Sequence, residues 1–364
     1  MLKKLFQKFF PGNKSALAVI VVGSITWSLT MVKSGIIYSY GMGFWGPNGH
    51  DGIWHISLMK SLSGGSWQMP VFAGETIKNY HIGFDLLLAF IHKITFIPVE
   101  TLYFQIIPPI LALLLGIFAY KFTLSWTKSS RRAWWATFFV YFGGSWGWVV
   151  TLLRTGELGG ESMFWSQQSI STLINPPFAL SILLIFIGLT LLLKGLRTKD
   201  NKLLMIASFI FGFLIQIKVY AGILILAGLF AGGVWRMFNR KGISLLKVFA
   251  GSLIISILLF SPVTRGVDQT LIFKPFWFLE SMMAYPDRFY WPKLGEAMVN
   301  YKLSGNFIRG IPAYLLAFAI FWFGNLGTRV IKEVLVFKWI KNFRKVTYME
   351  VMFATVIILG VVLP

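Results

Sequence analysis

Residues 178–194 read FALSILLIFIGLTLLLK, and only the last of these positions carries a charge. A helix that crosses a membrane needs about 20 predominantly apolar residues, so this stretch predicts a transmembrane helix. Similar runs occupy 15–37, 102–124, 133–153, 203–217, 219–235, 245–263, 312–328 and 349–364. The sequence therefore predicts an all-α, polytopic bundle of about nine spans in a single membrane domain, 1–364.

The composition also indicates a membrane protein. Hydrophobic residues make up 56% of the 364 positions and charged residues 13%, and the mean hydropathy is +0.70. Soluble domains contain about 25% charged residues. Cysteine is absent, which excludes disulfides, a thiol nucleophile and cysteine metal ligands.

The two ends of the chain give further expectations. The first run, 15–37, contains Trp27 and Lys33 and lacks a small-residue cleavage site, so we expect a signal anchor that is not cleaved. The last run reaches Pro364 while it is still apolar. A native chain rarely ends inside a span, and we therefore expect a longer protein that is truncated at this point.

The basic residues predict the orientation, because cytoplasmic loops of membrane proteins are rich in Lys and Arg. With the basic tail 1–14 in the cytoplasm, the inner segments collect most of the 34 basic residues but only Asp200 and Glu333 as acids. One-sided charge explains the pI of 10.1 without a nucleic-acid partner. We expect a plasma-membrane protein whose outer loops are 38–101, 154–177 and 264–311.

The predicted orientation depends on whether residues 79–97 (NYHIGFDLLLAFIHKITFI) cross the membrane. As a span they would place the basic KSSRR group outside, so we interpret them as an amphipathic helix in the outer interface. Four residues would form its narrow, solvated polar stripe at about 100° per residue: Lys78, His81, Asp85 and His92. Residues 51–63 predict a second interfacial helix in the same loop.

All four histidines lie between positions 50 and 92, and two of them flank Asp51 in GHDGIWHI, residues 49–56. Asp51 and His55 are four residues apart and share one helical face. Asp51 alternatively suits a helix N-cap. Without cysteine or a compact pair of histidines, the cluster is a weak zinc signal.

The predicted segments follow in a fixed order: an anchor span, a long outer loop with an early acid and two juxtamembrane helices, and then many spans. This order resembles the GT-C class of integral membrane glycosyltransferases, which includes bacterial and archaeal mannosyltransferases. The similar motifs are Asp51 in GHDGIWHISLMKSL, NYHIG at 79–83, INPPF at 174–178 and KVYAG at 218–222. The resemblance implies inverting transfer of a hexosyl or pentosyl group from a polyprenyl-phosphate carrier. The acceptor would be a glycan, lipid or protein at the outer face of the membrane, in assembly of the cell envelope.

The resemblance also implies roles for individual residues. Asp51 would be the general base, and His55 would orient it or bind phosphate. The donor phosphate would need cations, because negative charge develops on it. The expected substrate-binding residues are Glu75, Lys78, Tyr80, His81, Glu157, Glu161, Asn175, Lys218 and Arg265, with Arg154 as a further outer cation.

Several alternatives stay open at this stage. Asp51 is not part of a D-x-D or D-E pair, so the sequence does not define a metal cofactor. The alternative is Mg²⁺ or Mn²⁺ held by Asp51 and a glutamate of the second outer loop. Lys218 alternatively snorkels to the interface, and the Trp and Tyr residues of 276–291 predict an interfacial belt. The competing function is a transporter, or a flippase or polymerase component without transferase activity. Transporters place ionisable residues within their spans, whereas here these residues concentrate in outer loops.

Overall fold

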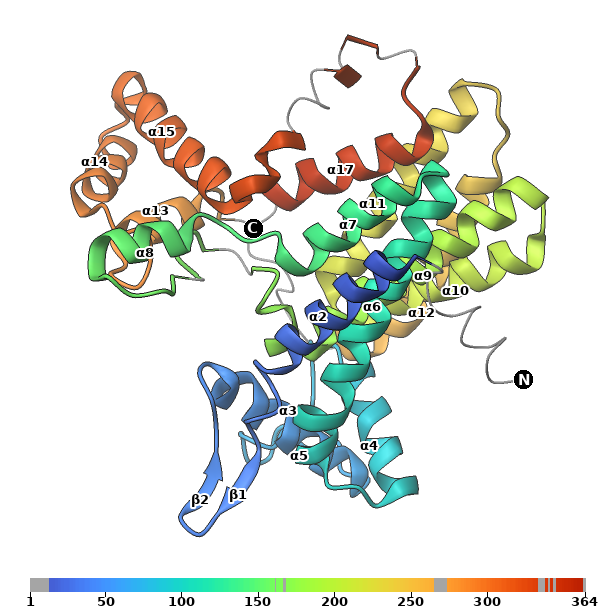
Figure 1. The fold of residues 1–364 in the computed structure, drawn as a ribbon, viewed down its shortest axis with the longest axis horizontal. Coiled ribbons are helices and arrows are strands. Elements are labelled where there is room, and N and C mark those ends of the chain that lie inside the picture. The colour runs from blue at the N-terminus through green and yellow to red at the C-terminus, as the bar shows by residue number, and fades with distance from the viewer. Residues whose placement is uncertain are drawn as a thin grey trace. The chain divides into compact units, whose positions relative to one another are not determined.

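The computed structural model describes residues 13–160, 162–165, 168–264, 274–332, 338–339, 341–342 and 345–362. These residues fold mostly into α-helices (Figure 1). The chain divides into two compact units. Unit 1 comprises Met1–Tyr141, Thr172–Leu271 and Thr347–Leu359, and unit 2 comprises Phe142–Ser171, Ile272–Val346 and Gly360–Pro364.

Unit 1 contains the long apolar helices α2 (Lys14–Ser28), α6 (Ile107–Thr127), α7 (Ser130–Phe142), α9 (Pro176–Thr198), α10 (Asn201–Ile217), α11 (Val219–Phe238), α12 (Ser244–Thr264) and α17 (Tyr348–Val362). α6 is preceded by α5 (Val99–Thr101) and by the π-helical turn η1 (Leu102–Ile106). The ends follow from capping chemistry. Asn13 and Asp200 accept backbone hydrogen bonds at the starts of α2 and α10, and left-handed Lys128 and Lys199 end α6 and α9.

Four helices of the described residues are long and apolar enough to cross a membrane: Val99–Thr127, Pro176–Thr198, Val219–Phe238 and Phe307–Val330. The number rises to five if the consecutive helices Ser130–Phe142 and Gly147–Thr155 form one span. The prediction of a helical protein with several helices long and apolar enough to cross a membrane is therefore confirmed. The predicted number of about nine spans is not confirmed by helix length.

Residues 38–101, the predicted first outer loop, contain two short helices, as predicted, but their bounds and burial differ. They are α3 (Asn48–Ser63) and α4 (Gly83–Thr95), and the antiparallel hairpin β1 (Ile36–Tyr38) and β2 (Gly41–Gly43) precedes them. Tyr80 and His81 come before α4 rather than within it. The predicted solvated stripe is wrong for His81 and Asp85, which are 9% and 0% exposed.

Tyr141 joins three helices in the core of unit 1. Its hydroxyl donates to the carbonyl of Ala112 at 2.6 Å and lies 3.1 Å from Ser24 Oγ, and its own carbonyl accepts from Trp27 Nε1 at 3.0 Å. The ring occupies space that only glycine leaves, since a Cβ at Gly23 would lie 2.2 Å from it. α2, α6 and α7 are thereby held together around buried polar groups that are paired.

A second set of bonds fixes α3 to the end of the first helix. Asn48, the first residue of α3, is buried, and its Nδ2 donates to the Thr30 carbonyl at 2.7 Å and to Ser34 Oγ at 2.8 Å. Gln105 Nε2, from η1, donates to the carbonyls of Val32 and Ser34. Position and rotation of α3 follow from these contacts, and with them the direction of its Asp51 and His55 side chains.

Unit 2 is a smaller helical assembly with a core of its own. It contains α8 (Gly147–Thr155), α13 (Trp277–Ala284), α14 (Pro292–Leu303), α15 (Phe307–Leu326) and the 3₁₀ turn η3 (Gly327–Lys332). Methionine and aromatic side chains dominate the core: Met163, Phe164, Phe278, Met282, Met283, Met298 and Phe321.

Candidate functional site

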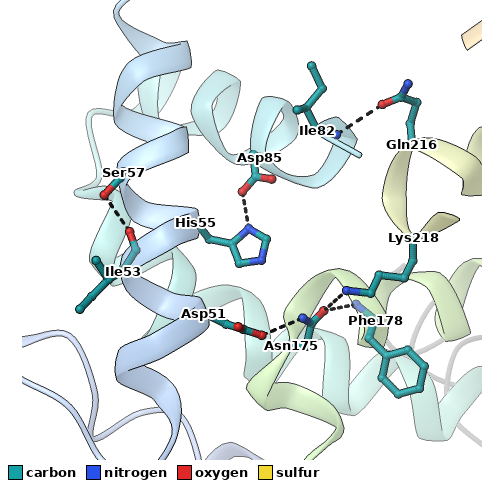
Figure 2. A network of polar contacts seen from close by, with 10 residues as sticks. All are labelled: Asp51, Ile53, His55, Ser57, Ile82, Asp85, Asn175, Phe178, Gln216 and Lys218. Atoms are coloured by element: carbon teal, nitrogen blue, oxygen red, sulfur yellow. Dashed lines mark hydrogen bonds and ion pairs between the residues drawn. The ribbon is translucent and has the colours of Figure 1, made fainter. Parts of the chain in front are cut away.

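Asp51 lies in the first turn of α3 and does not cap it. The helix begins at Asn48 after Pro47, and no side chain makes a capping bond there. The two carboxylate oxygens of Asp51 instead have side-chain partners. Oδ2 accepts from Asn175 Nδ2 at 3.0 Å (Figure 2). Oδ1 lies 3.0 Å from His50 Nδ1. The cap-only alternative for Asp51 is therefore wrong.

Asn175 connects Asp51 to Lys218. Its Oδ1 accepts from Lys218 Nζ at 3.2 Å and from the backbone N–H of Phe178 at 3.1 Å. The second bond caps α9, whose first two residues are Pro176 and Pro177 and bring no N–H of their own. A single amide therefore orients its oxygen toward a cation and its nitrogen toward a carboxylate, and it joins segments that are 124 and 43 residues away in sequence (Figure 2).

Asp51 and Lys218 are the two charged ends of this hydrogen-bonded network, and the pKa of each lies below its ordinary value. Burial alone would raise the pKa of Asp51, but the hydrogen bonds from His50 and Asn175 outweigh it, and the pKa lies below its ordinary value. Asp51 is therefore ionised at neutral pH, and its side chain is still 39% exposed. Burial lowers the pKa of Lys218, although Asp51 and Asp85 oppose this shift. Lys218 is half-buried between α10 and α11.

His55 and Asp85 form a second, fully buried pair beside Asp51. His55 Nδ1 lies 2.7 Å from Asp85 Oδ1, and the two residues are 1% and 0% exposed (Figure 2). Burial raises the pKa of Asp85, against the attraction of His55. Within the described chain this is the single hydrogen bond of the His55 ring. An ionised Asp85 holds the ring proton on Nδ1 and leaves Nε2 as an acceptor.

Aromatic rings surround this pair. Tyr103 stacks on His55 with ring centroids 5.5 Å apart, and it belongs to the π-helical turn η1, a local geometry that recurs at functional sites. Tyr80 stacks on His81 at 4.5 Å and meets Trp54 edge-on at 5.4 Å. Burial holds the pKa of His81 down, to about 4, and the charge of Lys218 adds to the effect. His81 is therefore neutral at pH 7.

Three polar atoms around His55 are buried without a hydrogen-bond partner in the described part of the chain: Asp85 Oδ2, His81 Nδ1 and Tyr103 Oη. A buried polar atom without a partner costs about 1–3 kcal/mol. Proteins keep few such atoms, and groups that serve a ligand or a reaction are one reason to keep them. Their concentration here marks the region as a candidate binding site.

The structure brings together six of the predicted site residues: Asp51, His55, Tyr80, His81, Asn175 and Lys218. Other predicted residues lie elsewhere. Glu75 and Lys78 are exposed and pair with each other at 3.7 Å. Glu157 and Arg154 belong to unit 2, where both are exposed and the Arg154 guanidinium lies over the ring of Phe289. Glu161 and Arg265 lie outside the described residues.

Sequence reasoning missed Asp85 and Gln216 as parts of the site. A lone carboxylate within the apolar run GFDLLLAF was the available signal, because such a group needs a buried partner. Gln216 Oε1 accepts from the Ile82 N–H at 3.4 Å, and its Nε2 donates to the Leu259 carbonyl at 2.7 Å (Figure 2). Gly83 permits this contact, since a Cβ there would lie 2.8 Å from the Gln216 carbonyl oxygen.

The geometry does not indicate a metal centre. Over the ranges that the structure describes, no three His, Asp or Glu side chains approach one another closely enough to hold a metal ion. Asp51 has amide and imidazole partners rather than a second carboxylate.

Comparisons with models of protein families, with characterised proteins and with solved structures gave no match. The functional proposal therefore depends on the residues and the geometry of this polar cluster.

Proposed function

We propose that this protein is an inverting membrane glycosyltransferase that moves a sugar from a polyprenyl-phosphate carrier to an acceptor at the outer face of the membrane. The observation that carries the proposal is the chain Asp51–Asn175–Lys218 (Figure 2). It joins GHDGIWHI, INPPF and KVYAG, three stretches on which the resemblance to the GT-C class rests. An accessible carboxylate and a half-buried ammonium group are what sugar transfer from a phosphate requires.

In this mechanism Asp51 is the general base. It accepts the proton of the acceptor hydroxyl as that oxygen bonds to the anomeric carbon and the bond from that carbon to the phosphate oxygen breaks. The phosphate leaves with the bonding electron pair, and Lys218 stabilises the charge that develops on it. Glycosyl transfer has an oxocarbenium-like transition state, so the acceptor hydroxyl becomes acidic as bond formation proceeds. A carboxylate of low pKa then suffices to remove its proton.

The buried pair His55–Asp85 supports this base. His55 follows Asp51 by one helical turn, about 6 Å along α3. Asp85 orients the imidazole, as a buried carboxylate does in other proton-transfer sites. We assign His55 to accepting a hydrogen bond through Nε2 from a neighbouring hydroxyl of the acceptor, and Asp85 to positioning His55.

An apolar groove next to Lys218 supports a lipid-linked donor. It has a volume of about 140 Å³ and lies between α9, α11 and α17, lined by residues that include Phe178, Ile182, Leu189, Tyr220, Leu224 and Met352. Phe178 and Tyr220 form the end nearest the polar cluster, since Lys218 Nζ lies 5.5 Å from the Tyr220 ring centroid. The groove has room for a part of a polyprenyl tail, while the rest of the tail stays in the bilayer.

The full topology belongs to the same proposal. The four long helices, the pair α7–α8 and four shorter apolar helices, Lys14–Ser28, Asn201–Ile217, Ser244–Phe260 and Tyr348–Gly360, coincide with the nine apolar runs of the sequence. Three of the shorter helices, α2, α10 and α17, reach at most about 26 Å, so thinning of the bilayer or flanking residues must cover the rest of its core of about 30 Å. With the basic loops in the cytoplasm, Asp51 faces the extracytoplasmic side of the plasma membrane.

The test is turnover by the purified protein in lipid nanodiscs. Polyprenyl-phosphate mannose and polyprenyl-phosphate glucose are offered as donors with a mixed pool of glycan, lipid and peptide acceptors, and mass spectrometry detects release of the polyprenyl phosphate and the new glycosidic bond. We expect Asp51→Asn to lower turnover by about 10²–10⁴-fold. Asp287→Asn is the matched control, because it is the same substitution at a carboxylate of unit 2 whose side chain is 67% exposed.

Two results would contradict the proposal. Turnover of the Asp51→Asn protein at the wild-type rate removes Asp51 as the base. Sugar flux across proteoliposomes without any covalent product identifies a transporter or flippase instead. Turnover that disappears with EDTA and returns with Mg²⁺ or Mn²⁺ would add a divalent cation at Asp51 to the mechanism.

A further inference from the structure

Unit 2 contains an open cleft that the proposed reaction does not use. The cleft has a volume of about 570 Å³ and lies between α13 and α14. Its walls combine two aromatic residues with charged and amide groups: Trp277, Tyr285, Lys274, Glu280, Glu296 and Asn300. Its size is in the range of about 300–1,000 Å³ that is usual for small-molecule sites.

The two walls are held at a fixed spacing by backbone contacts. The N–H of Trp291 donates to the Met283 carbonyl at 2.8 Å, and α14 starts with the next residue, Pro292. Gly295 lines the cleft and approaches α13 so closely that a Cβ would lie 3.2 Å from the Met283 Cβ. The cleft is therefore a feature of the packed backbone and does not depend on side-chain rotamers alone.

The aromatic side of the cleft is supported from behind by Trp165. This ring meets Trp277 edge-on at 5.2 Å and Tyr285 at 6.1 Å between centroids. The Arg288 guanidinium covers the Trp165 ring at 3.9 Å, and its Nη1 donates to the Ser162 carbonyl at 2.9 Å. Trp277 and Tyr285 are thereby held, while Tyr285 remains 49% exposed. The cleft has a supported aromatic surface that is accessible to a ligand.

The polar side offers groups of both signs in fixed places. Glu280 Oε1 accepts from Lys302 Nζ at 2.8 Å and from Tyr314 Oη at 2.5 Å, so this carboxylate is neutralised by a partner. Glu296 and Asn300 are one turn apart on α14, and both are exposed. Glu296 has no ion-pair partner in the described ranges, and Lys274 is a further lining residue of the cleft.

We propose that this cleft is a binding site for a neutral oligosaccharide. A sugar ring has an apolar C–H face, which an aromatic side chain covers, and a rim of hydroxyls that donate to carboxylates and accept from ammonium and amide groups. Phosphate-bearing ligands such as the donor of the first site are disfavoured, because Glu296 stands unpaired in the wall. The site lies within unit 2 alone, and its existence does not depend on glycosyl transfer at Asp51.

Saturation-transfer NMR on the full chain in nanodiscs tests the inference, with mannotriose, maltotriose and chitotriose as the probes. We expect transfer to the ring C–H protons of at least one trisaccharide. We expect Tyr285→Ala, and separately Glu296→Gln, to weaken binding about tenfold or more, the effect of about 1.4 kcal/mol. Glu157→Gln, an exposed carboxylate of the same unit outside the cleft, is the control that leaves binding unchanged.

The outcomes separate this site from the proposed reaction. Binding that persists in Asp51→Asn while turnover is lost supports two independent sites. Absence of saturation transfer to all three trisaccharides overturns the inference, whatever the donor assay shows. Binding that both Tyr285→Ala and Glu296→Gln leave intact places the sugar elsewhere and overturns it as well. The circular dichroism spectrum of each variant shows whether the helices of unit 2 remain folded.

Discussion

The buried pair His55–Asp85 predicts a large energetic coupling between two residues 30 positions apart. In Asp85→Leu, His55 stays 1% exposed with its Nδ1–H unpaired, which costs about 1–3 kcal/mol. In His55→Phe, Asp85 Oδ1 loses its hydrogen bond to His55. Asp85 Oδ2 already has no hydrogen-bond partner among the described residues. Removing one member of a buried ionic pair costs about 3–5 kcal/mol.

The double variant His55→Phe/Asp85→Leu should behave differently from the sum of the two. Replacing a buried pair by apolar groups of similar volume is often neutral or stabilising, so we expect its free energy of unfolding within about 1–2 kcal/mol of wild type. The resulting coupling energy is at least about 2 kcal/mol. The exposed pair Glu75–Lys78 is the control, for which an alanine cycle should give under about 1 kcal/mol.

The assay is reversible unfolding by SDS in mixed micelles, followed by tryptophan fluorescence, with all four proteins of each cycle. Additive effects at His55 and Asp85 would refute the reasoning, because they would mean that the two side chains do not form a buried pair. The double variant also separates stability from function. If the pair positions the reacting groups, this protein unfolds like wild type but has lost turnover.

Four further predictions follow from the same site. Acidification from pH 7 to pH 5 should destabilise wild type by about 2 kcal/mol more than His81→Phe in the SDS assay, because His81 has a pKa of about 4 when folded and 6.5 when unfolded, so the unfolded state binds more protons as pH falls through this window; equal losses would contradict this. Gly83→Ala should cost about 1–3 kcal/mol through overpacking against the Gln216 carbonyl, whereas Gly49→Ala, where the nearest atom lies 3.5 Å away, should cost less. Lys218→Met should raise KM for the polyprenyl-phosphate donor about 10–100-fold, the effect of a hydrogen bond to a charged group, and an unchanged KM would remove Lys218 from phosphate binding. Asn175→Leu should raise the pH at which turnover falls on the acid side, because the pKa of Asp51 loses a hydrogen bond that lowers it; an unmoved acid limb would contradict the role of Asn175.

The helices of unit 1 could be predicted well from the sequence, because long apolar runs are a direct physical signal of helices in a membrane. The number of membrane crossings is a weaker inference, since several of these runs form helices of 10–17 residues. The division into two units had no counterpart in composition. Both units are helical and apolar, and no linker marks the boundary between them.

The site could be predicted in part. Asp51, Asn175 and Lys218 were selected from short motifs, and they do form one hydrogen-bonded chain. Asp85 was misread because helical periodicity tells which residues share a face but not what covers that face. Here the cover comes from His55 on α3, and Gln216 on α10 holds the start of α4.

The position of Asn175 has a consequence for the time course of synthesis. After Asp51 has been synthesised, 124 more residues must be added before its partner Asn175 is present, and Lys218 follows 43 residues later. At roughly 5–20 residues per second, the first interval alone lasts about 6–25 s. During this interval a carboxylate without its amide partner must be kept in water or by the insertion machinery, since hydrocarbon would penalise it by several kcal/mol. The nascent chain therefore contains Asp51 long before the helices that complete the polar cluster exist.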